Sequence, residues 1–232
     1  MKQILKQHVA DAYARITSLR AGRAVEYWEH RYSNGGLSGD GSTGRLAKFK
    51  AEVLNGLVAE FDVTRVLELG CGDGQQLVLA TYPEYVGIDI SPTAVRLSTA
   101  AHASKSTVSF LCMDPTAVID NLGLLRSDMA MSLDVIYHIL DEDDFNAHVD
   151  LLFESASKLV VLFASDSETL DPKFTARAHI RHWPVRRLVD ERFGAEWQLA
   201  RSIPNRYPFD PADGANTSIA HFQVYTKIEA KQ

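Results

Sequence analysis

Residues Glu68 to Gly74, ELGCGDG, combine a carboxylate with three glycines, directly after the apolar run of Val66 and Leu67. A glycine-rich turn after a buried strand lets a ligand approach backbone N–H groups and the start of a helix. The third glycine comes one position earlier than in the G-x-G-x-x-G pattern of dinucleotide-binding proteins. Glu68 would repel a pyrophosphate and attract a ligand ammonium group.

Two further carboxylates follow the next two apolar runs. Asp89 ends YVGID, and a carboxylate at this place can accept hydrogen bonds from both hydroxyls of a ribose. Asp114 ends VSFLCMD and can accept from the exocyclic amine of an adenine, with Ile90 or Met113 against the ring. The ligand implied by these positions has a ribose, an adenine and an amino-acid ammonium group, but no diphosphate.

These residues require a sheet whose strands all end at one edge. From Arg65, short apolar runs without polar alternation predict strands buried on both faces, and the segments between them are long enough for crossover helices. This alternation predicts a doubly wound parallel α/β sheet, followed by an antiparallel strand pair. Helical spacing predicts a helix before residue 22, one over 46–58, one after residue 144 and one from Pro184 to Phe193. The predicted strands are 65–69, 85–90, 108–112, 128–133, 158–164, 197–204 and 218–228.

The order of these motifs resembles that of the class I (seven-stranded, Rossmann-like) S-adenosylmethionine-dependent methyltransferases. ELGCGDG, GIDIS and CMD look like their first three motifs, and SDMAMSLDVIYHI looks like their fourth strand and the segment after it. The resemblance covers about Arg65 to Ile228, and it implies S-adenosylmethionine as cofactor and S-adenosylhomocysteine as product. It implies that Glu68 and the glycines hold the methionine end, Asp89 the ribose and Asp114 the adenine. The cofactor-binding residues expected are Glu68, Gly70, Cys71, Gly72, Gly74, Asp89, Ile90, Met113, Asp114 and Leu133.

His138 and Asp134 are the candidate catalytic residues. Methyl transfer to a hydroxyl needs a base, and an imidazole is suited to this near neutral pH. Asp134 lies four residues earlier and would orient the ring on a helical turn. The alternative is that His138 only packs against the cofactor or caps a turn; the role of base is preferred.

Residues 141–144 are four consecutive carboxylates. They could bind a divalent ion with His138 or His148, or they could begin a helix, where negative charge is favourable. The helix is the preferred interpretation because the amphipathic segment FNAHVDLLFESASKL follows. No metal ligand is therefore predicted, and metal dependence stays open.

The acceptor is expected to contact three segments rich in polar and aromatic residues. Residues 33–44 contain five glycines and predict a mobile lid, although an idle linker would have the same composition. Residues 178–183 and 204–209 mix aromatic and hydrogen-bonding side chains, which suits sugars, but solvated and packing roles are alternatives. These segments resemble a subgroup associated with sugar and polysaccharide modification. The substrate-binding candidates are Tyr27, Trp28, Arg31, Tyr137, His179, Arg181, His182 and Tyr207.

The favoured function is O-methylation of a small molecule, preferably at a sugar or oligosaccharide hydroxyl. The alternatives are an RNA, DNA or N-methyltransferase, a non-catalytic adenosyl-binding scaffold and a nicotinamide oxidoreductase. Nucleic acid is disfavoured because the net charge is −6 and no [DN]-P-P-[YF] motif occurs, although basic residues lie between Arg177 and Arg187. The glycine spacing and Glu68 disfavour the oxidoreductase.

The composition predicts one globular domain with a small lid. Hydrophobic residues make up 46% of the 232 residues, and two cysteines are too few for a disulfide framework. The polar N-terminus is not expected to be a signal peptide, and no run approaches the roughly 18 apolar residues of a membrane span. We therefore expect a cytoplasmic protein, with residues 1–45 as N-terminal helix and lid and 46–232 as methyltransferase domain. The first helix is expected to pack on the domain or on a second copy in a homodimer.

Overall fold

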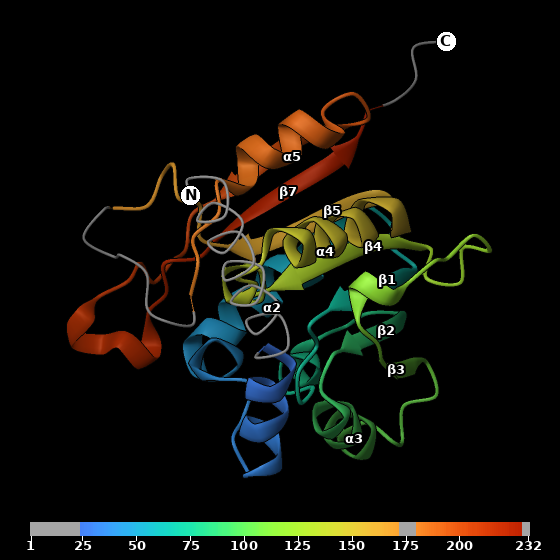
Figure 1. Ribbon diagram of the computed structural model, residues 1–232, viewed down its shortest axis with the longest axis vertical. Coiled ribbons are helices and arrows are strands. Elements are labelled where there is room, and N and C mark those ends of the chain that lie inside the picture. The colour runs from blue at the N-terminus through green and yellow to red at the C-terminus, as the bar shows by residue number, and fades with distance from the viewer. Residues whose placement is uncertain (1–23, 172–179, 229–232) are drawn as a thin grey trace, which may run out of the picture.

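The computed structural model describes residues 24–171 and 180–228, and a seven-stranded sheet lies at its centre (Figure 1). The strand order is β3-β2-β1-β4-β5-β7-β6. Strands β1 to β5 are parallel, and β7 runs antiparallel to both β5 and β6. The predicted parallel sheet with a C-terminal antiparallel pair is confirmed. The strands are β1 (Arg65–Leu69), β2 (Glu84–Asp89), β3 (Val108–Cys112), β4 (Ser127–Leu133), β5 (Ala156–Ala164), β6 (Trp197–Ile203) and β7 (His221–Lys227).

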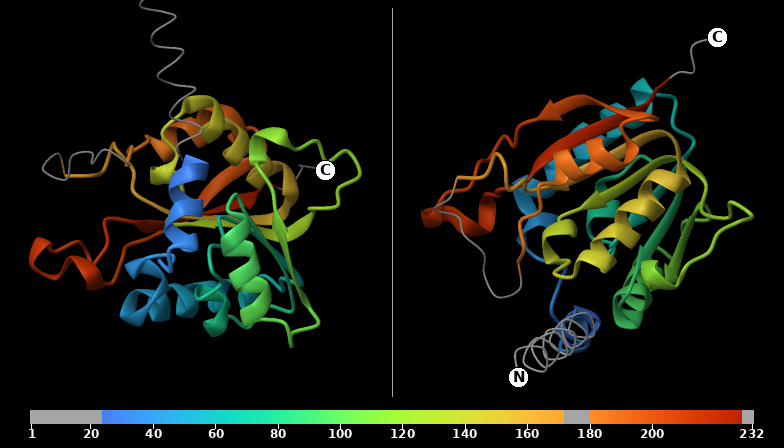
Figure 2. Two further views of the ribbon diagram at one scale, coloured as in Figure 1. Left: turned by 60° about the horizontal axis from the view of Figure 1, so that its bottom comes forward. Right: turned by 45° about the horizontal axis from the view of Figure 1, so that its top comes forward.

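Helices cover both faces of this sheet (Figure 2). The helices α2 (Gly44–Glu60) and α3 (Pro92–Ala101) pack on one face, and α4 (Glu142–Ser155) and α5 (Val185–Phe193) pack on the other. Residues 24–33 are also helical and lead into the glycine-rich segment. The helix predicted before residue 22 lies outside the described residues.

The crossover helices are only partly as expected. An α-helix connects β2 to β3 and β4 to β5, but the connections before β2 and before β4 contain only the short 3-10 helices η2 (Gln76–Leu79) and η3 (Pro115–Ala117). Residues 70–83 are too few for a full helix, because the glycine turn and the approach to β2 occupy most of them. The glycine turn therefore leads into a single 3-10 turn rather than an α-helix.

Two helix starts are fixed by side chains at the carboxyl edge of the sheet. Ser91 caps α3 by accepting a hydrogen bond from the backbone N–H of Ala94, and Pro92 occupies the first helical position. Asp141 caps α4 by accepting from the backbone N–H groups of Asp143 and Asp144. The interpretation of the acidic run as a helix start is confirmed.

The core is divided by the sheet into two apolar layers. On the face of α4, the rings of Phe145 and Trp183 stack with centroids 4.3 Å apart. On the face of α2, Leu54 and Leu57 are fully buried against the sheet. These layers hold the carboxyl ends of β1, β2 and β4 rigidly beside one another. None of the described helices is long and apolar enough to cross a membrane.

Candidate active site

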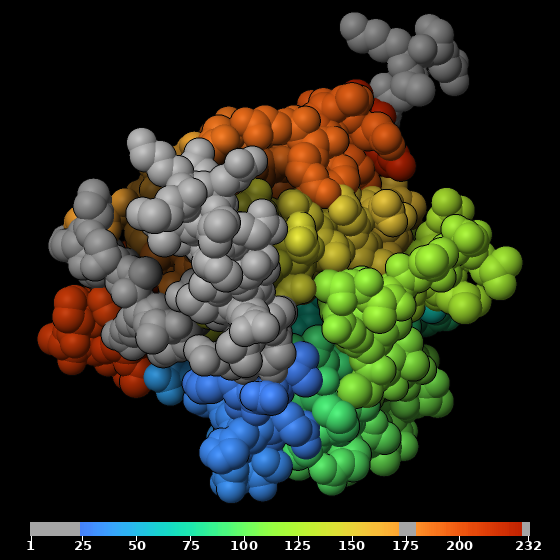
Figure 3. Space-filling view, in the orientation of Figure 1, coloured from blue at the N-terminus to red at the C-terminus, as the bar shows by residue number. Residues whose placement is uncertain are grey.

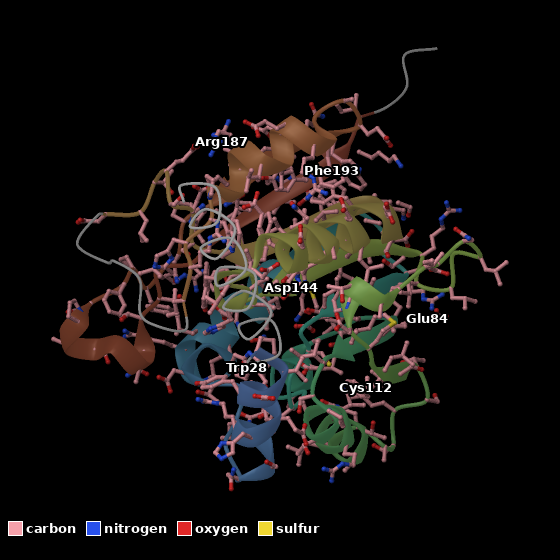
Figure 4. The ribbon with its side chains drawn as sticks, in the orientation of Figure 1. Trp28, Glu84, Cys112, Asp144, Arg187 and Phe193 are labelled. Atoms are coloured by element: carbon pink, nitrogen blue, oxygen red, sulfur yellow. The ribbon has the colours of Figure 1, made fainter. Side chains whose placement is uncertain are left out.

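A cavity with a volume of about 320 Å³ lies at the carboxyl edge of the sheet. Its walls come from residues 24–43, which we call the N-terminal segment, and from the glycine turn. The ends of β2, β3 and β4 and the first turns of α4 complete them. Trp28 and Asp144 approach this region from the helix of residues 24–33 and from α4, respectively (Figure 4). Ligands of open parallel sheets bind at this edge.

The glycine turn forms the floor of the cavity and is held by the end of β2. Gly72 has a φ of 57°, and a Cβ there would lie 2.2 Å from the Oγ atom of Ser38. Only glycine fits this left-handed position with so close a neighbour. The backbone N–H of Gly72 donates to the Oδ2 atom of Asp89 over 2.9 Å, and the N–H of Ser91 donates to Oδ1 over 2.9 Å. Asp89 thus joins the glycine turn to the start of α3 while lining the cavity.

Glu68 lines the cavity at the inner end of the glycine turn, although it is only 4% exposed. Burial raises the pKa of Glu68 to about 7, and the hydrogen bond donated by the Tyr85 hydroxyl over 2.6 Å opposes this shift. A cation that arrived beside this carboxylate would favour its ionised form. This environment fits the predicted contact with an ammonium group.

The opposite end of the cavity contains a second group of carboxylates. Asp114 lies at the start of η3, and one of its oxygens accepts from the N–H and the hydroxyl of Thr116. Asp144 faces it from α4, and burial, followed by the charges of Asp141 and Asp114, raises the pKa of Asp144. Nearby, His148 lies under the cavity and shares a 2.9 Å hydrogen bond with Ser132; burial lowers the pKa of His148 to about 4. An uncharged nucleobase that donates N–H hydrogen bonds to these carboxylates would suit this end of the cavity.

His138 and Asp134 both line the cavity but differ in their surroundings. His138 ends the 3-10 helix η4 (Ile136–His138), and its ring packs edge-on against Trp28 with centroids 5.1 Å apart. Asp134 has a φ of 61°, and its carboxylate accepts from the Tyr137 hydroxyl over 2.8 Å and from the Lys50 ammonium over 2.7 Å. These two donors hold the carboxylate of Asp134, so its role in orienting His138 stays a prediction.

The N-terminal segment closes over the cavity through two polar contacts. The carboxylate of Glu29 accepts from the Ser91 hydroxyl over 2.6 Å and from the Thr93 N–H over 3.0 Å, at the start of α3. The Ser38 hydroxyl donates to the carboxylate of Asp73 over 2.7 Å, beside the glycine turn. In the space-filling view the segment lies directly against the region of α3 (Figure 3). The described part of the segment is thus anchored beside the cavity, and the action of residues 33–44 as a mobile lid stays a prediction.

The structure brings together most of the predicted cofactor residues. All of them line the cavity except Gly74, which instead packs against α3, where a Cβ would lie 3.1 Å from the His102 ring. Gly74 therefore permits close packing of the helix and not, in this geometry, contact with the ligand. The residues of this set that line the cavity are Glu68, Gly70, Cys71, Gly72, Asp89, Ile90, Met113, Asp114 and Leu133.

The predicted substrate residues are more dispersed. Trp28 lines the cavity, whereas His179 lies outside the described residues. The remaining candidates are not among the described cavity residues and have other contacts. Tyr27 packs on Trp28, Arg31 donates to the Leu37 carbonyl, Tyr137 binds Asp134, Arg181 lies over the Trp183 ring, His182 binds Ser165, and Tyr207 packs on Phe49 and Arg45.

Several cavity residues were not predicted from the sequence, and the most informative are Lys50 and Gln76. Lys50 is 1% exposed and forms an ion pair with Asp134, which is partly exposed. A signal for it exists in the sequence, because Lys50 interrupts the apolar stripe Leu46, Leu54 and Leu57 at a four-residue step. Gln76 has no comparable signal, because it falls in a segment that the pattern predicts to be an ordinary helix.

Comparisons with known proteins find similarity to methyltransferases. A family model described as a methyltransferase domain matches residues 66–156. The structure resembles N-methyltransferase NodS from Bradyrhizobium japonicum WM9 in complex with S-adenosyl-l-homocysteine, with 13% identity and a TM-score of 0.67 over 89% of this chain and 100% of that chain. No curated protein matches the sequence.

Two other solved structures are similar over a smaller share of the chain. Magnesium protoporphyrin IX methyltransferase (ChlM) from Synechocystis PCC 6803 with bound SAM has 16% identity and a TM-score of 0.56 over 78% of this chain and 79% of that chain. The methyltransferase domain of bacterial CtHen1 has 17% identity and a TM-score of 0.57 over 76% of this chain and 97% of that chain. The chain thus has the Rossmann-like α/β fold of the class I S-adenosylmethionine-dependent methyltransferases.

Proposed function

We propose that the protein is an S-adenosylmethionine-dependent methyltransferase that acts on a small molecule. The observation that carries this proposal is the convergence of Glu68, the glycine turn, Asp89 and Asp114 on one cavity at the carboxyl edge of the sheet. The carboxylates occupy the ends of β1, β2 and β3 in the order in which an amino acid, a ribose and an adenine would need them. S-Adenosylmethionine, when bound, supplies an activated methyl group on a sulfonium.

The protein's residues would bind and orient this cofactor and its acceptor. Asp89 would accept from the ribose hydroxyls, and Asp114 would accept from the adenine amine through the oxygen that Thr116 does not bind. The closed N-terminal segment would exclude water and hold the acceptor near the donor, which is the main catalytic contribution in a direct displacement. S-Adenosylhomocysteine would leave after the segment opens.

His138 would take the proton from an acceptor hydroxyl as the new bond forms. Its position at the cavity, between the end of β4 and the N-terminal helix, supports this role. Trp28, which packs on the imidazole, offers an apolar face on which a sugar ring can stack. These two residues support a sugar or oligosaccharide hydroxyl as the preferred acceptor, in agreement with the polar and aromatic composition of the neighbouring segments.

An amine is a second candidate acceptor, and the charge of the cavity favours it. Besides the residues that would hold the cofactor, Asp134, Asp141 and Asp144 line the walls. A protonated amine would be attracted to such a site and could lose its proton to His138 before transfer. A protein without catalytic activity that only binds an adenosyl ligand would need none of these groups on the acceptor side.

Calorimetric titration with S-adenosylhomocysteine, beside NADH on the same protein, tests the proposal. We expect micromolar or tighter binding of the first ligand and no heat with the second. Binding of NADH alone, or of neither ligand with and without Mg²⁺, would contradict the proposal. Methyl transfer would then be assayed with oligosaccharides and with amino sugars, which separate the hydroxyl from the amine as acceptor.

A further inference from the structure

The backbone that carries His138 along the cavity wall is bound by donors from a distant segment of the chain. The 3-10 helix η4 ends at His138, and carbonyl groups at the end of a helix have no N–H partner within that helix. In this part of the chain the carbonyls of Tyr137, Ile139 and Leu140 are each paired with a donor from residues 181–183. The position of the backbone around His138 therefore depends on these donors.

All three donors belong to Arg181 and Trp183. The backbone N–H of Arg181 donates to the Tyr137 carbonyl over 2.8 Å. The Nη1 atom of Arg181 donates to the Leu140 carbonyl over 2.9 Å. The indole Nε1 atom of Trp183 donates to the Ile139 carbonyl over 2.8 Å. The three hydrogen bonds thus hold the backbone on both sides of the candidate base.

The donors are themselves held in place by the core and by the chain that follows β5. Trp183 is 3% exposed, and its ring stacks on Phe145 of α4 with centroids 4.3 Å apart. The Trp183 carbonyl accepts from the backbone N–H of Ser167 over 2.9 Å. The guanidinium carbon of Arg181 lies 3.4 Å from the centroid of the Trp183 ring, so the indole also orients the arginine.

This arrangement decides where the imidazole enters the cavity. One side of the His138 ring packs edge-on against Trp28, with centroids 5.1 Å apart, and its attachment point is fixed by the backbone of residues 137–140. A displacement of about 1 Å in a catalytic group can lower a rate about 100-fold. Arg181 and Trp183 are not among the described residues that line the cavity, so their effect on the site runs through this backbone.

We infer that Arg181 and Trp183 are positioning residues that set the place of His138 in the cavity. The inference rests on the proposed function, in which His138 takes the proton of the acceptor. It gives Arg181 a role through the backbone of residues 137–140 in place of the direct contact with the acceptor that the sequence predicts. The segment after β5 would thus serve the base and not the acceptor.

The first test removes each side-chain donor and keeps most of the packing. Trp183→Phe retains an aromatic ring without the indole N–H, and Arg181→Met retains the aliphatic stem without Nη1. We expect both variants to shift the His138 ring resonances in proton–carbon NMR spectra, which His138→Ala assigns. The nuclear Overhauser contact between the rings of His138 and Trp28 should weaken. Calorimetric affinity for S-adenosylhomocysteine should stay within about 2-fold, since neither altered side chain lines the cavity.

Turnover gives a second measurement, with the oligosaccharide or amino sugar that the methyl-transfer assay identifies. We expect kcat to fall about 10- to 100-fold in Trp183→Phe and in Arg181→Met, because the base is displaced from the acceptor. KM should change little, because the acceptor still binds. Arg181→Lys keeps a cation that can donate to the Leu140 carbonyl, so it should recover part of the lost activity.

Two substitutions of the same kind at other places are the controls. Trp197→Phe alters a buried tryptophan that packs on Phe153, and Arg187→Met alters a half-exposed arginine that pairs with Glu168. Neither change should move the His138 resonances, kcat or the affinity for S-adenosylhomocysteine. Thermal melts verify that every variant folds.

The outcomes separate this inference from the proposed function. Shifted His138 resonances and a lower kcat with intact affinity for S-adenosylhomocysteine support the positioning role. Unchanged resonances in the folded variants, equal shifts in the controls, or shifted resonances with wild-type kcat overturn it and leave cofactor binding untouched. Failure of the wild-type protein to bind S-adenosylhomocysteine overturns the proposed function itself. If Trp183→Phe does not fold, the two Arg181 variants decide the question.

Discussion

Ser38 and Asp73 join the N-terminal segment to the glycine turn through three hydrogen bonds of 2.7–3.0 Å. The hydroxyl of Ser38 takes part in two of them, and its backbone N–H in the third. Since both residues lie beside Gly72, the segment rests on the part of the site that would hold the cofactor. Opening of the segment must break these bonds.

The first prediction concerns this contact. Ser38→Ala removes two of the three hydrogen bonds and leaves the N–H of Asp73 without its acceptor. We expect S-adenosylhomocysteine to dissociate about 10-fold faster, because each such bond contributes on the order of 1 kcal/mol. Stopped-flow displacement would measure the rate. Ser33→Ala, which removes an exposed hydroxyl that donates to the His30 carbonyl, is the matched control. Equal dissociation rates of S-adenosylhomocysteine in both variants would contradict the prediction that the Ser38 hydrogen bonds slow release of the ligand.

The second prediction concerns His138. If it is the base, His138→Ala should lower kcat at least about 100-fold, within the usual contribution of general base catalysis. The affinity for S-adenosylhomocysteine should change little, because the groups proposed to bind the cofactor remain. Single-turnover methyl transfer and calorimetry would be measured on the same sample. A variant with full activity would limit His138 to packing against Trp28.

The third prediction is a pH effect at Glu29. Hydrogen bonds from Ser91 and then Thr93 lower the pKa of Glu29 to about 2. Because the folded pKa lies below the ordinary value of 4.5, the stabilisation is fully present above about pH 4.5 and is lost as the pH falls toward 2. Glu29→Gln should therefore have a lower Tm than the wild type near neutral pH, and the difference should narrow in acid. Glu26→Gln, on the same helix and exposed, should show no such trend.

The fourth prediction has the opposite sign. Burial raises the pKa of Glu68 to about 7, so the folded protein binds a proton more strongly than the unfolded chain between about pH 4.5 and 7. Stability of the unliganded protein should fall as the pH rises through this window. Glu68→Gln should then raise the Tm at about pH 8 and change it little at about pH 5. The same variant should bind S-adenosylhomocysteine more weakly; a lower Tm at alkaline pH would contradict the assignment.

The strands were well predicted from the sequence, and their shared edge followed from them. The run LVVLFA, residues 159–164, is apolar without interruption because both of its faces are buried. The positions of Asp89 and Asp114 at neighbouring strand ends therefore follow from the residue pattern alone. The 3-10 helices before β2 and β4 could not be predicted from the residue pattern, because length and polarity alone do not distinguish a short turn from a helix.

The acceptor side could not be predicted in the same way. Arg181 and Tyr207 lie in segments of suitable composition, yet neither side chain lines the cavity. Arg181 packs on Trp183, and Tyr207 packs on Phe49 and Arg45. Loop conformation decides such placements, and no periodic pattern encodes it. Lys50 was missed for a different reason: a lysine in an amphipathic helix is normally on the solvated face, although its place in the apolar stripe of α2 is a signal.

The described N-terminal segment, residues 24–43, is attached to the rest of the protein at two points beside the cavity. Glu29 is fixed to the first turn of α3, and Ser38 is fixed beside the glycine turn, while Val25 and Trp28 face the cavity. A chain shortened to begin at Gly44 would lose the segment that borders the cavity. It would also leave Thr93, at the start of α3, without the carboxylate of Glu29 as hydrogen-bond acceptor. For directed evolution, a library aimed at new acceptors should keep Glu29 and Ser38 and diversify Val25 and Trp28.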